Sequence, residues 1–195
     1  MKDRPILFSA PMVRAILEGR KTQTRRVVKN AHVITCDDRF GATDARCPYG
    51  VPGDRLWVKE KWRPAWHPEM FCSVQYASDS SYRKPTINDE TRGHRFADMC
   101  EQSGDNAEPW HPSIHMWREF SRLTLEVVAV RVERLQVIGL ADCAAEGAPP
   151  THPADNVCDS TETYRKLWES INGVGSWDAN PWVWVIEFKR IEARP

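Results

Sequence analysis

The sequence predicts a small mixed fold of the α+β class, in which short helices flank a β-barrel. Apolar and polar residues alternate toward both ends of 122–133, which is the period of a half-buried strand. A second strand-like run, 182–188, follows the turn-forming residues 178–181. Short helical patterns separate the strand-like runs without a regular β-α-β rhythm or an internal repeat, which favours α+β over a doubly wound sheet.

The first expected helix lies near the N-terminus. After the apolar run 5–8, Ser9 offers a side-chain oxygen to cap a helix, and apolar residues over 12–17 supply its buried stripe. Gly19 stands where a glycine ends many helices. The residues that follow Gly19 should therefore lie on a turn or at the entry to a strand.

Turn chemistry marks the middle of the chain. The run 49–54 holds two glycines and a proline, and the aromatic and β-branched residues after it predict a strand over 55–62. From about 66 to 110 the sequence is polar and turn-rich, with one candidate strand at 72–76. We interpret 1–195 as a single domain with a loop-rich insertion there. Short helices are expected over 138–146 and 161–171.

Composition excludes several classes of protein. Lys and Arg number 27 and Asp and Glu number 27, so bulk charge cannot attract nucleic acid and any binding must come from a local patch. No stretch approaches the ~18 apolar residues of a membrane span, which predicts a soluble, cytoplasmic protein without membrane partners. Oligomeric state is left open.

The six cysteines are widely spaced, so we expect reduced thiols. Neither His111 with His115 nor Cys36 with Cys47 is supported as a zinc site, because Pro112 breaks the helix that the histidine pair would need and the cysteines form no Cys-x-x-Cys. We expect no metal and no cofactor.

The segment 19–26 gathers four positive charges and two threonine hydroxyls in a chain of zero net charge. One interpretation is a solvated turn, since such runs are common on surfaces. A second is a phosphate-binding patch in which Arg20, Arg25 and Arg26 supply forked donors. A third is catalytic, because a Lys near other cations has a lowered pKa and Lys21 could then deprotonate the hydroxyl of Thr24.

Several segments together resemble an ASCH domain of the type found in phage-related proteins. They are 5–8, 16–26, 52–58, 130–135, 145–147 and 182–188. The resemblance covers both ends of the chain and leaves out about 66–110. It implies a PUA-like fold, a small β-barrel flanked by short helices that binds RNA.

The resemblance also implies site residues. One amidohydrolase of this family removes the acetyl group from N4-acetylcytidine with a Lys, a Thr three residues later and a distant Glu. These fall on Lys21, Thr24 and Glu146 of this sequence. In that arrangement Thr24 is the nucleophile, Lys21 the base, and Glu146 orients the lysine or handles the leaving-group proton. On the residues alone, Glu146 could equally be an exposed carboxylate before a helix-ending glycine.

Further binding residues are expected in polar surroundings. Trp62 lies beside a polar loop, where an exposed indole could stack on a base. Phage-type ASCH proteins carry a Ser-x-His-Met element similar to 113–116, which suggests that Ser113 and His115 contact a ligand. For both places a structural role remains the alternative.

The expected partner is therefore a nucleoside, RNA or modified nucleic acid, bound at 20–26 and Glu146. The leading hypothesis is hydrolysis of an amide on an acylated cytidine. A non-catalytic reader of RNA or modified bases and a ribonuclease are the alternatives.

Overall fold

The structure is a computed structural model that describes residues 1–29, 34–36, 40–43, 46–103, 109–148 and 157–191. It divides into two compact units. The first unit holds 1–4, 15–55 and 125–190, and the second unit holds 5–14, 56–124 and 191–195. Every helix in the described part of the chain is too short or too polar to cross a lipid bilayer.

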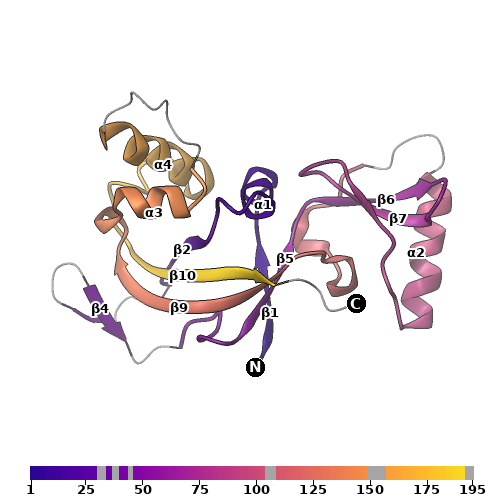
Figure 1. The fold of residues 1–195 in the computed structure, drawn as a ribbon, viewed down its shortest axis with the longest axis horizontal. Helices are drawn as coiled ribbons and strands as arrows, with labels where there is room; N and C mark the ends of the chain where they lie inside the picture. Colours follow the sequence, from indigo (N-terminus) through magenta and orange to yellow (C-terminus); the bar gives the residue numbers. More distant parts are fainter. Residues whose placement is uncertain (30–33, 37–39, 44–45, 104–108, 149–156, 192–195) are drawn as a thin grey trace. The chain divides into compact units, whose positions relative to one another are not determined.

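The protein is of the mixed α+β class, as expected (Figure 1). The helices are α1 (Ala10–Leu17), α2 (Glu90–Ser103), α3 (Leu140–Ala145) and α4 (Val157–Asn172). The strands are β1 (Asp3–Leu7), β2 (Gln23–Val27), β3 (Ile34–Cys36), β4 (Phe40–Thr43), β5 (Arg55–Lys59), β6 (Trp62–His67), β7 (Phe71–Tyr76), β8 (Tyr82–Arg83), β9 (Thr124–Arg134) and β10 (Trp182–Ile191).

The larger sheet runs in the order β1-β5-β9-β10-β2, and β4 joins β3 to β9. A smaller sheet has the order β6-β7-β8. The strands of the described residues do not form a closed barrel. The expected helix over 12–18 is α1, and Gly19 after it has a φ of +75°, the left-handed conformation of a helix-ending glycine.

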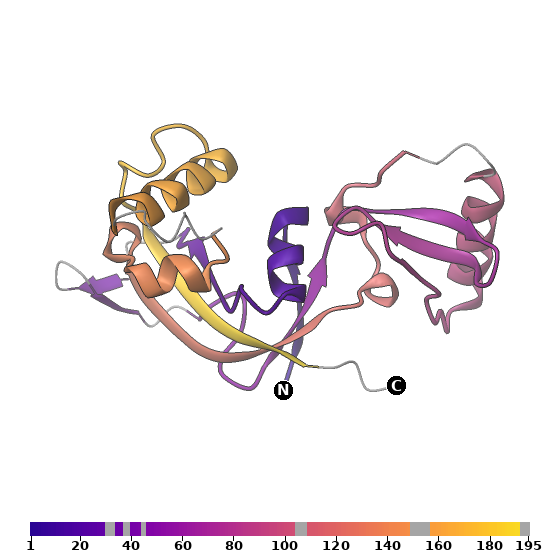
Figure 2. The same cartoon turned by 45° about the horizontal axis from the view of Figure 1, so that its top comes forward.

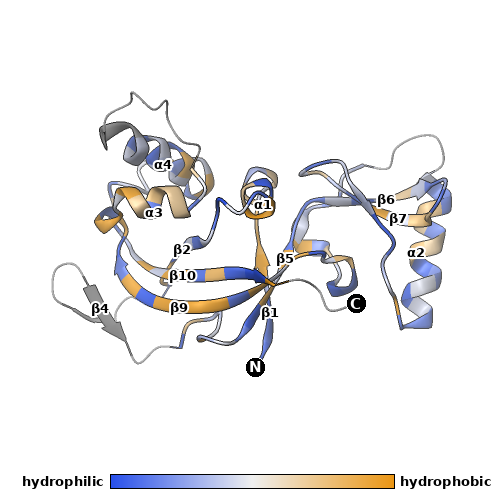
Figure 3. Ribbon diagram, in the orientation of Figure 1, coloured by the Kyte–Doolittle hydropathy of each residue, from blue (hydrophilic) through white to orange (hydrophobic). Residues whose placement is uncertain are grey.

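In the first unit, β2 and β10 pair antiparallel, and α3 and α4 pack against β10. Figures 1 and 2 show α3 and α4 beside the ends of β9 and β10. Val183 and Val185 of β10 lie in one core cluster with Tyr164 and Trp168 of α4. Figure 3 shows hydrophobic and hydrophilic residues interspersed along β9 and β10, which is typical of strands with unlike faces.

The register of β2 against β10 decides which side chains share a face. Arg25 pairs with Val185, whose side chain packs toward α3 and α4, whereas Thr24 pairs with Ile186. Directly opposed residues of an antiparallel pair point to the same side, and neighbours along a strand alternate. Gln23 and Arg25 therefore face α3, and Thr24 and Arg26 lie on the opposite face of β2.

The second unit has its own core, built on the β6-β7-β8 sheet and α2. Its buried cluster combines strand, helix and loop residues: Trp62, Val74, Tyr76, Phe96, Cys100, Met116 and Phe120. Much of the segment 66–110, which we expected to be rich in loops, thus forms β7, β8 and the 14-residue α2. Its polar composition reflects the exposed face of α2, because Phe96 and Cys100 of that helix are buried.

The described cysteines are thiols. Cys47, Cys72, Cys100 and Cys143 are free. The side chains of Cys36 and Cys158 lie outside the described part of the structure.

Candidate functional site

Lys21 and Glu146, which are 125 residues apart in sequence, form a buried ion pair in the first unit. The Lys21 Nζ donates hydrogen bonds of 2.8 Å to Glu146 Oε2, to the Glu146 carbonyl oxygen and to the Gln23 carbonyl oxygen. The two residues are only 2% and 3% exposed. The lysine and the glutamate that the resemblance assigns to one site are therefore in direct contact.

The backbone brings the pair together. Arg20 N and Lys21 N both donate to the Ala15 carbonyl at the end of α1, at 2.8 and 3.0 Å, which folds the chain back after Gly19. Thr22 N donates to the Ala145 carbonyl at 2.8 Å, and this bond joins the approach to β2 to the end of α3. The Lys21 backbone therefore lies beside Glu146 before the side chains meet.

Gly147 makes the close approach possible. Its φ is +76°, and a Cβ atom there would lie 2.9 Å from both the Lys21 Cβ and the Ala15 Cβ. Such distances are shorter than van der Waals contact, so a larger residue at this position would displace Lys21.

Arg25 extends the pair into a cluster. Its Nη1 donates to Glu146 Oε1 at 3.1 Å, and its Nη2 contacts Glu133 Oε1 at 2.6 Å and Asp142 Oδ2 at 3.2 Å. The guanidinium is fully buried. Glu146 thus gives one carboxylate oxygen to Lys21 and the other to Arg25. We call Lys21, Arg25, Glu133, Asp142 and Glu146 the Lys21 cluster.

An outer layer of polar contacts holds the acids of this cluster. Arg131 Nε donates to Glu133 Oε2 at 3.1 Å. Gln23 Nε2 donates to Asp142 Oδ1 at 3.1 Å, and Asp142 Oδ2 accepts from Gly139 N at the start of α3, also at 3.1 Å. The acids are therefore oriented by β2, β9 and α3 together.

Burial acts to lower the pKa of both cations of the cluster, but the net shifts have opposite directions. Loss of solvent lowers the pKa of Lys21, and the adjacent Glu146 carboxylate offsets only part of that effect. For Arg25 burial also acts downward, but the Glu146 and Glu133 carboxylates outweigh it and raise the pKa. Lys21 is consequently the more readily deprotonated of the two cations.

Thr24 is buried in β2, next to the cluster along the chain. By the period of the strand it lies on the face opposite Gln23 and Arg25. Lys21 Nζ bonds to Glu146 and to the Gln23 carbonyl, and Arg25 bonds to Glu146, all on the face of β2 from which Thr24 points away. The structure thus joins two of the three expected catalytic side chains.

The remaining arginines of the basic segment differ in their surroundings. Arg20 is exposed and donates from Nε to Glu18 Oε2 at 2.8 Å and from Nη1 to the Gly147 carbonyl at 3.3 Å. Arg26 is half-buried, with its Cζ 5.9 Å from the centre of the Tyr49 ring. Of the three, Arg25 alone belongs to the Lys21 cluster, and the patch of three solvent-facing arginines that we expected does not form.

Trp62, Ser113 and His115 belong to the second unit. Trp62 is buried against His111, with ring centroids 4.7 Å apart, and against Phe120. It is therefore not the exposed stacking platform that we expected, because neighbouring aromatic residues cover it. Ser113 and His115 lie in a single 3₁₀ turn, where His115 is exposed.

Glu133 and Asp142 were not among the expected site residues. Both carry a sequence signal that can be seen in retrospect. Glu133 has the same parity along β9 as the buried Leu125 and Val127, and Asp142 stands at the third position of a helix that has glycine at its N-cap. Among the described residues, no group of three or more His, Cys, Asp or Glu side chains is arranged to hold a metal ion.

No protein-family model, curated protein or solved structure matches this chain. We therefore infer function from the geometry of the Lys21 cluster and from the sequence resemblance.

Proposed function

We propose that the first unit binds a nucleoside or nucleic acid and hydrolyses the amide of an N4-acylated cytidine, within a PUA-like fold of the ASCH type. The observation that carries this proposal is the buried 2.8 Å contact between Lys21 Nζ and Glu146 Oε2. The resemblance nominates these two residues separately, from segments at opposite ends of the chain. Their meeting is what an amidohydrolase site of this kind requires.

The proposed reaction requires a local rearrangement of β2 that brings the Thr24 hydroxyl to Lys21, because Thr24 lies on the opposite face of the strand. Lys21 in its neutral form then accepts the Thr24 hydroxyl proton while the Thr24 oxygen forms a bond to the acyl carbon. The bond from the acyl carbon to N4 then breaks, and the Lys21 ammonium returns the proton to the departing cytidine nitrogen. Water hydrolyses the resulting threonine ester, releasing a carboxylic acid and the free hydroxyl. Glu146 holds the lysine throughout and stabilises its charged form.

Two features of the cluster support these roles. Burial lowers the pKa of Lys21, which favours the neutral amine that the reaction requires. Arg25 donates to Glu146 Oε1 while Lys21 donates to Oε2, so both carboxylate oxygens are held and the acid orients the lysine. Substrate entry requires movement at the edge of β2, because Lys21, Thr24 and Glu146 are all buried.

The decisive test compares two variants of one residue, with N4-acetylcytidine as substrate. Thr24→Val removes the hydroxyl with little change in volume, and should lower kcat on the order of 10⁴-fold or more. Thr24→Ser keeps a hydroxyl and should retain measurable turnover. Release of acetate is followed with time, and thermal unfolding confirms that both variants fold. Wild-type protein that is folded but produces no acetate would refute the hydrolase.

The full hydrogen bonding of the Lys21 ammonium favours a second candidate function. In it, the protein binds RNA or modified bases without catalysis, as a non-catalytic reader. The ammonium group has three N–H donors, and its three hydrogen bonds occupy them in this conformation. A lysine so engaged can serve as a purely structural link between β2 and α3. The reader predicts nucleic-acid binding that weakens with salt and is unchanged in Thr24→Val, without turnover of any acylated nucleoside.

A further inference from the structure

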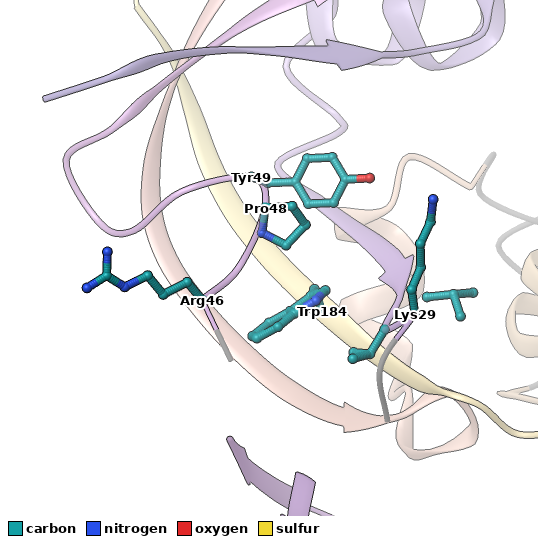
Figure 4. A pocket seen from close by; sticks show the side chains of 7 residues that line it. Lys29, Arg46, Pro48, Tyr49 and Trp184 are labelled. Atoms are coloured by element: carbon teal, nitrogen blue, oxygen red, sulfur yellow. The ribbon is translucent and has the colours of Figure 1, made fainter. Parts of the chain in front are cut away.

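A second feature of the first unit is a pocket of about 350 Å³ beyond the C-terminal end of β2. Its lining residues come from β2, β10 and the segment that precedes β5 (Figure 4). They are Val27, Val28, Lys29, Arg46, Pro48, Tyr49 and Trp184. None of them belongs to the Lys21 cluster.

Aromatic and aliphatic groups form the inner part of this pocket. Trp184 is almost fully buried and pairs with Arg26 across β10 and β2. Tyr49 is half-buried and has the Arg26 guanidinium 5.9 Å from its ring centre. Together with Pro48 and Val28, these rings offer an apolar surface suited to a flat aromatic group.

The outer part of the pocket is cationic. Lys29 and Arg46 are both exposed, and the seven lining residues include no carboxylate that would neutralise them. In the view of Figure 4, Trp184 lies between Lys29 on one side and Arg46 on the other. A ligand with one aromatic ring and an anionic group on each side of it would satisfy this arrangement.

The wall that carries Tyr49 is fixed by backbone contacts. Gly50 N donates to the Cys47 carbonyl at 3.1 Å, and Gly50 has a φ of +107° that a residue with a side chain would resist. Asp54 then fastens the turn, since its Oδ1 accepts from Lys2 N at 2.8 Å. The Tyr49 ring is thereby positioned before any ligand arrives, which lowers the entropic cost of binding.

We propose that this pocket binds one base of a single-stranded nucleic acid, with the phosphates on its two sides paired to Lys29 and Arg46. The inference takes the chemical class of the ligand from the proposed function. It narrows the expected ligand from a free nucleoside to a nucleotide within a strand. Stacking on Tyr49 would supply most of the base contact, and the two cations would supply the salt dependence.

The first experiment measures the salt dependence of binding to a fluorescein-labelled hexacytidylate by fluorescence anisotropy. Each phosphate contact on a single strand contributes about −0.7 to the slope of log K against log salt. Lys29→Ala and Arg46→Ala should therefore each make the slope shallower by about 0.7. The matched control is Lys166→Ala, which removes a lysine of the same unit that is 75% exposed and does not line the pocket. It should leave the slope unchanged.

The second experiment separates stacking from charge. Tyr49→Ala should weaken binding of the same hexacytidylate about 5- to 150-fold, the equivalent of ~1–3 kcal/mol per stacked base, without changing the slope. Tyr49→Phe keeps the ring and should bind nearly as well as the wild type. A deoxycytidine hexamer, run in parallel, distinguishes RNA from DNA as the source of the strand.

The binding experiments distinguish failure of the base-binding pocket from failure of the proposed hydrolase activity. Binding that is absent, or equal in Lys29→Ala, Arg46→Ala and Lys166→Ala, overturns the pocket even if acetate is released from the free nucleoside. Conversely, slope changes confined to the two pocket variants support it even if acetate is never released.

Discussion

Each unit contains an ionic cluster that joins acids from separate segments. The Lys21 cluster of the first unit uses a lysine and an arginine, whereas the cluster in the second unit uses an arginine. In the second unit, Arg122 Nε donates to Glu60 Oε1 at 2.9 Å and Arg122 Nη1 to Asp79 Oδ2, also at 2.9 Å. Its guanidinium lies 4.0 Å from the centre of the Tyr76 ring. We call Glu60, Asp79 and Arg122 the Arg122 cluster. In both places an arginine joins acids from separate segments.

The difference lies in the lysine and in access to solvent. Arg122 and Asp79 are 14% and 32% exposed, whereas the Lys21 and Arg25 side chains have no exposed surface. The pKa of Arg122, like that of Arg25, is raised by its acids against the effect of burial. An arginine therefore suffices to hold segments together. A fully buried lysine beside it adds a group that can lose its proton, which a structural link does not need.

The largest expected effect comes from Glu146→Ala. This change leaves Lys21 and Arg25 buried without the carboxylate that they share, and removing one partner of a buried pair typically costs ~3–5 kcal/mol. Hydrogen exchange should show the loss of stability in β2 and α3. Glu146→Gln is the control, because it keeps the shape and one acceptor, and it should cost less. A loss below about 1 kcal/mol in Glu146→Ala would mean that solvent reaches this cluster.

A smaller effect is expected for Glu60→Ala in the Arg122 cluster. Arg122 keeps Asp79 and partial access to water, so the loss should approach the ~1.5–3 kcal/mol of hydrogen bonds to a charged group. Hydrogen exchange in β6 and β7 is the readout. If Glu60→Ala destabilised its unit more than Glu146→Ala does, the contrast between the two clusters would be reversed.

The smallest effect is a pH dependence confined to the Arg122 cluster. Burial acts to raise the pKa of Asp79, but hydrogen bonds from Arg122 and Ser81 prevail and lower it to about 2. Because the unfolded carboxyl titrates near 3.8, this contribution to stability is complete above pH 4 and lost as the pH falls through 2. Chemical denaturation between pH 5 and 2 should show a flatter profile in Asp79→Asn than in the wild type.

Local patterns predicted much of the fold. The helix before Gly19, the strand β9 and the strand β10 were each expected from capping residues or from an alternating pattern, and they appear at those places. The content of 66–110 could not be predicted as well. The buried face of α2 rests on Phe96 and Cys100, and two apolar positions in a polar run give little signal of period.

The candidate site was predicted only in part, for a physical reason. Lys21 and Thr24 are neighbours in sequence, and the meeting of Lys21 with Glu146 was implied by the resemblance alone. The acids of Arg25 come from β9 and α3, more than a hundred residues away in sequence. Such pairings depend on tertiary packing, which cannot be predicted from the spacing of residues along the sequence. The burial of Trp62 likewise depends on Phe120 and His111 rather than on its polar neighbours in sequence.

Gly147 also limits the substitutions that this protein can tolerate during evolution. Gly93 in α2 has open space around the position of a Cβ, so substitution there meets no steric barrier. At Gly147 every alternative side chain would collide with the stem of Lys21. A glycine forced by a neighbouring lysine therefore tolerates no exchange. A search for distant relatives that share this site should look for the glycine together with the acid that precedes it.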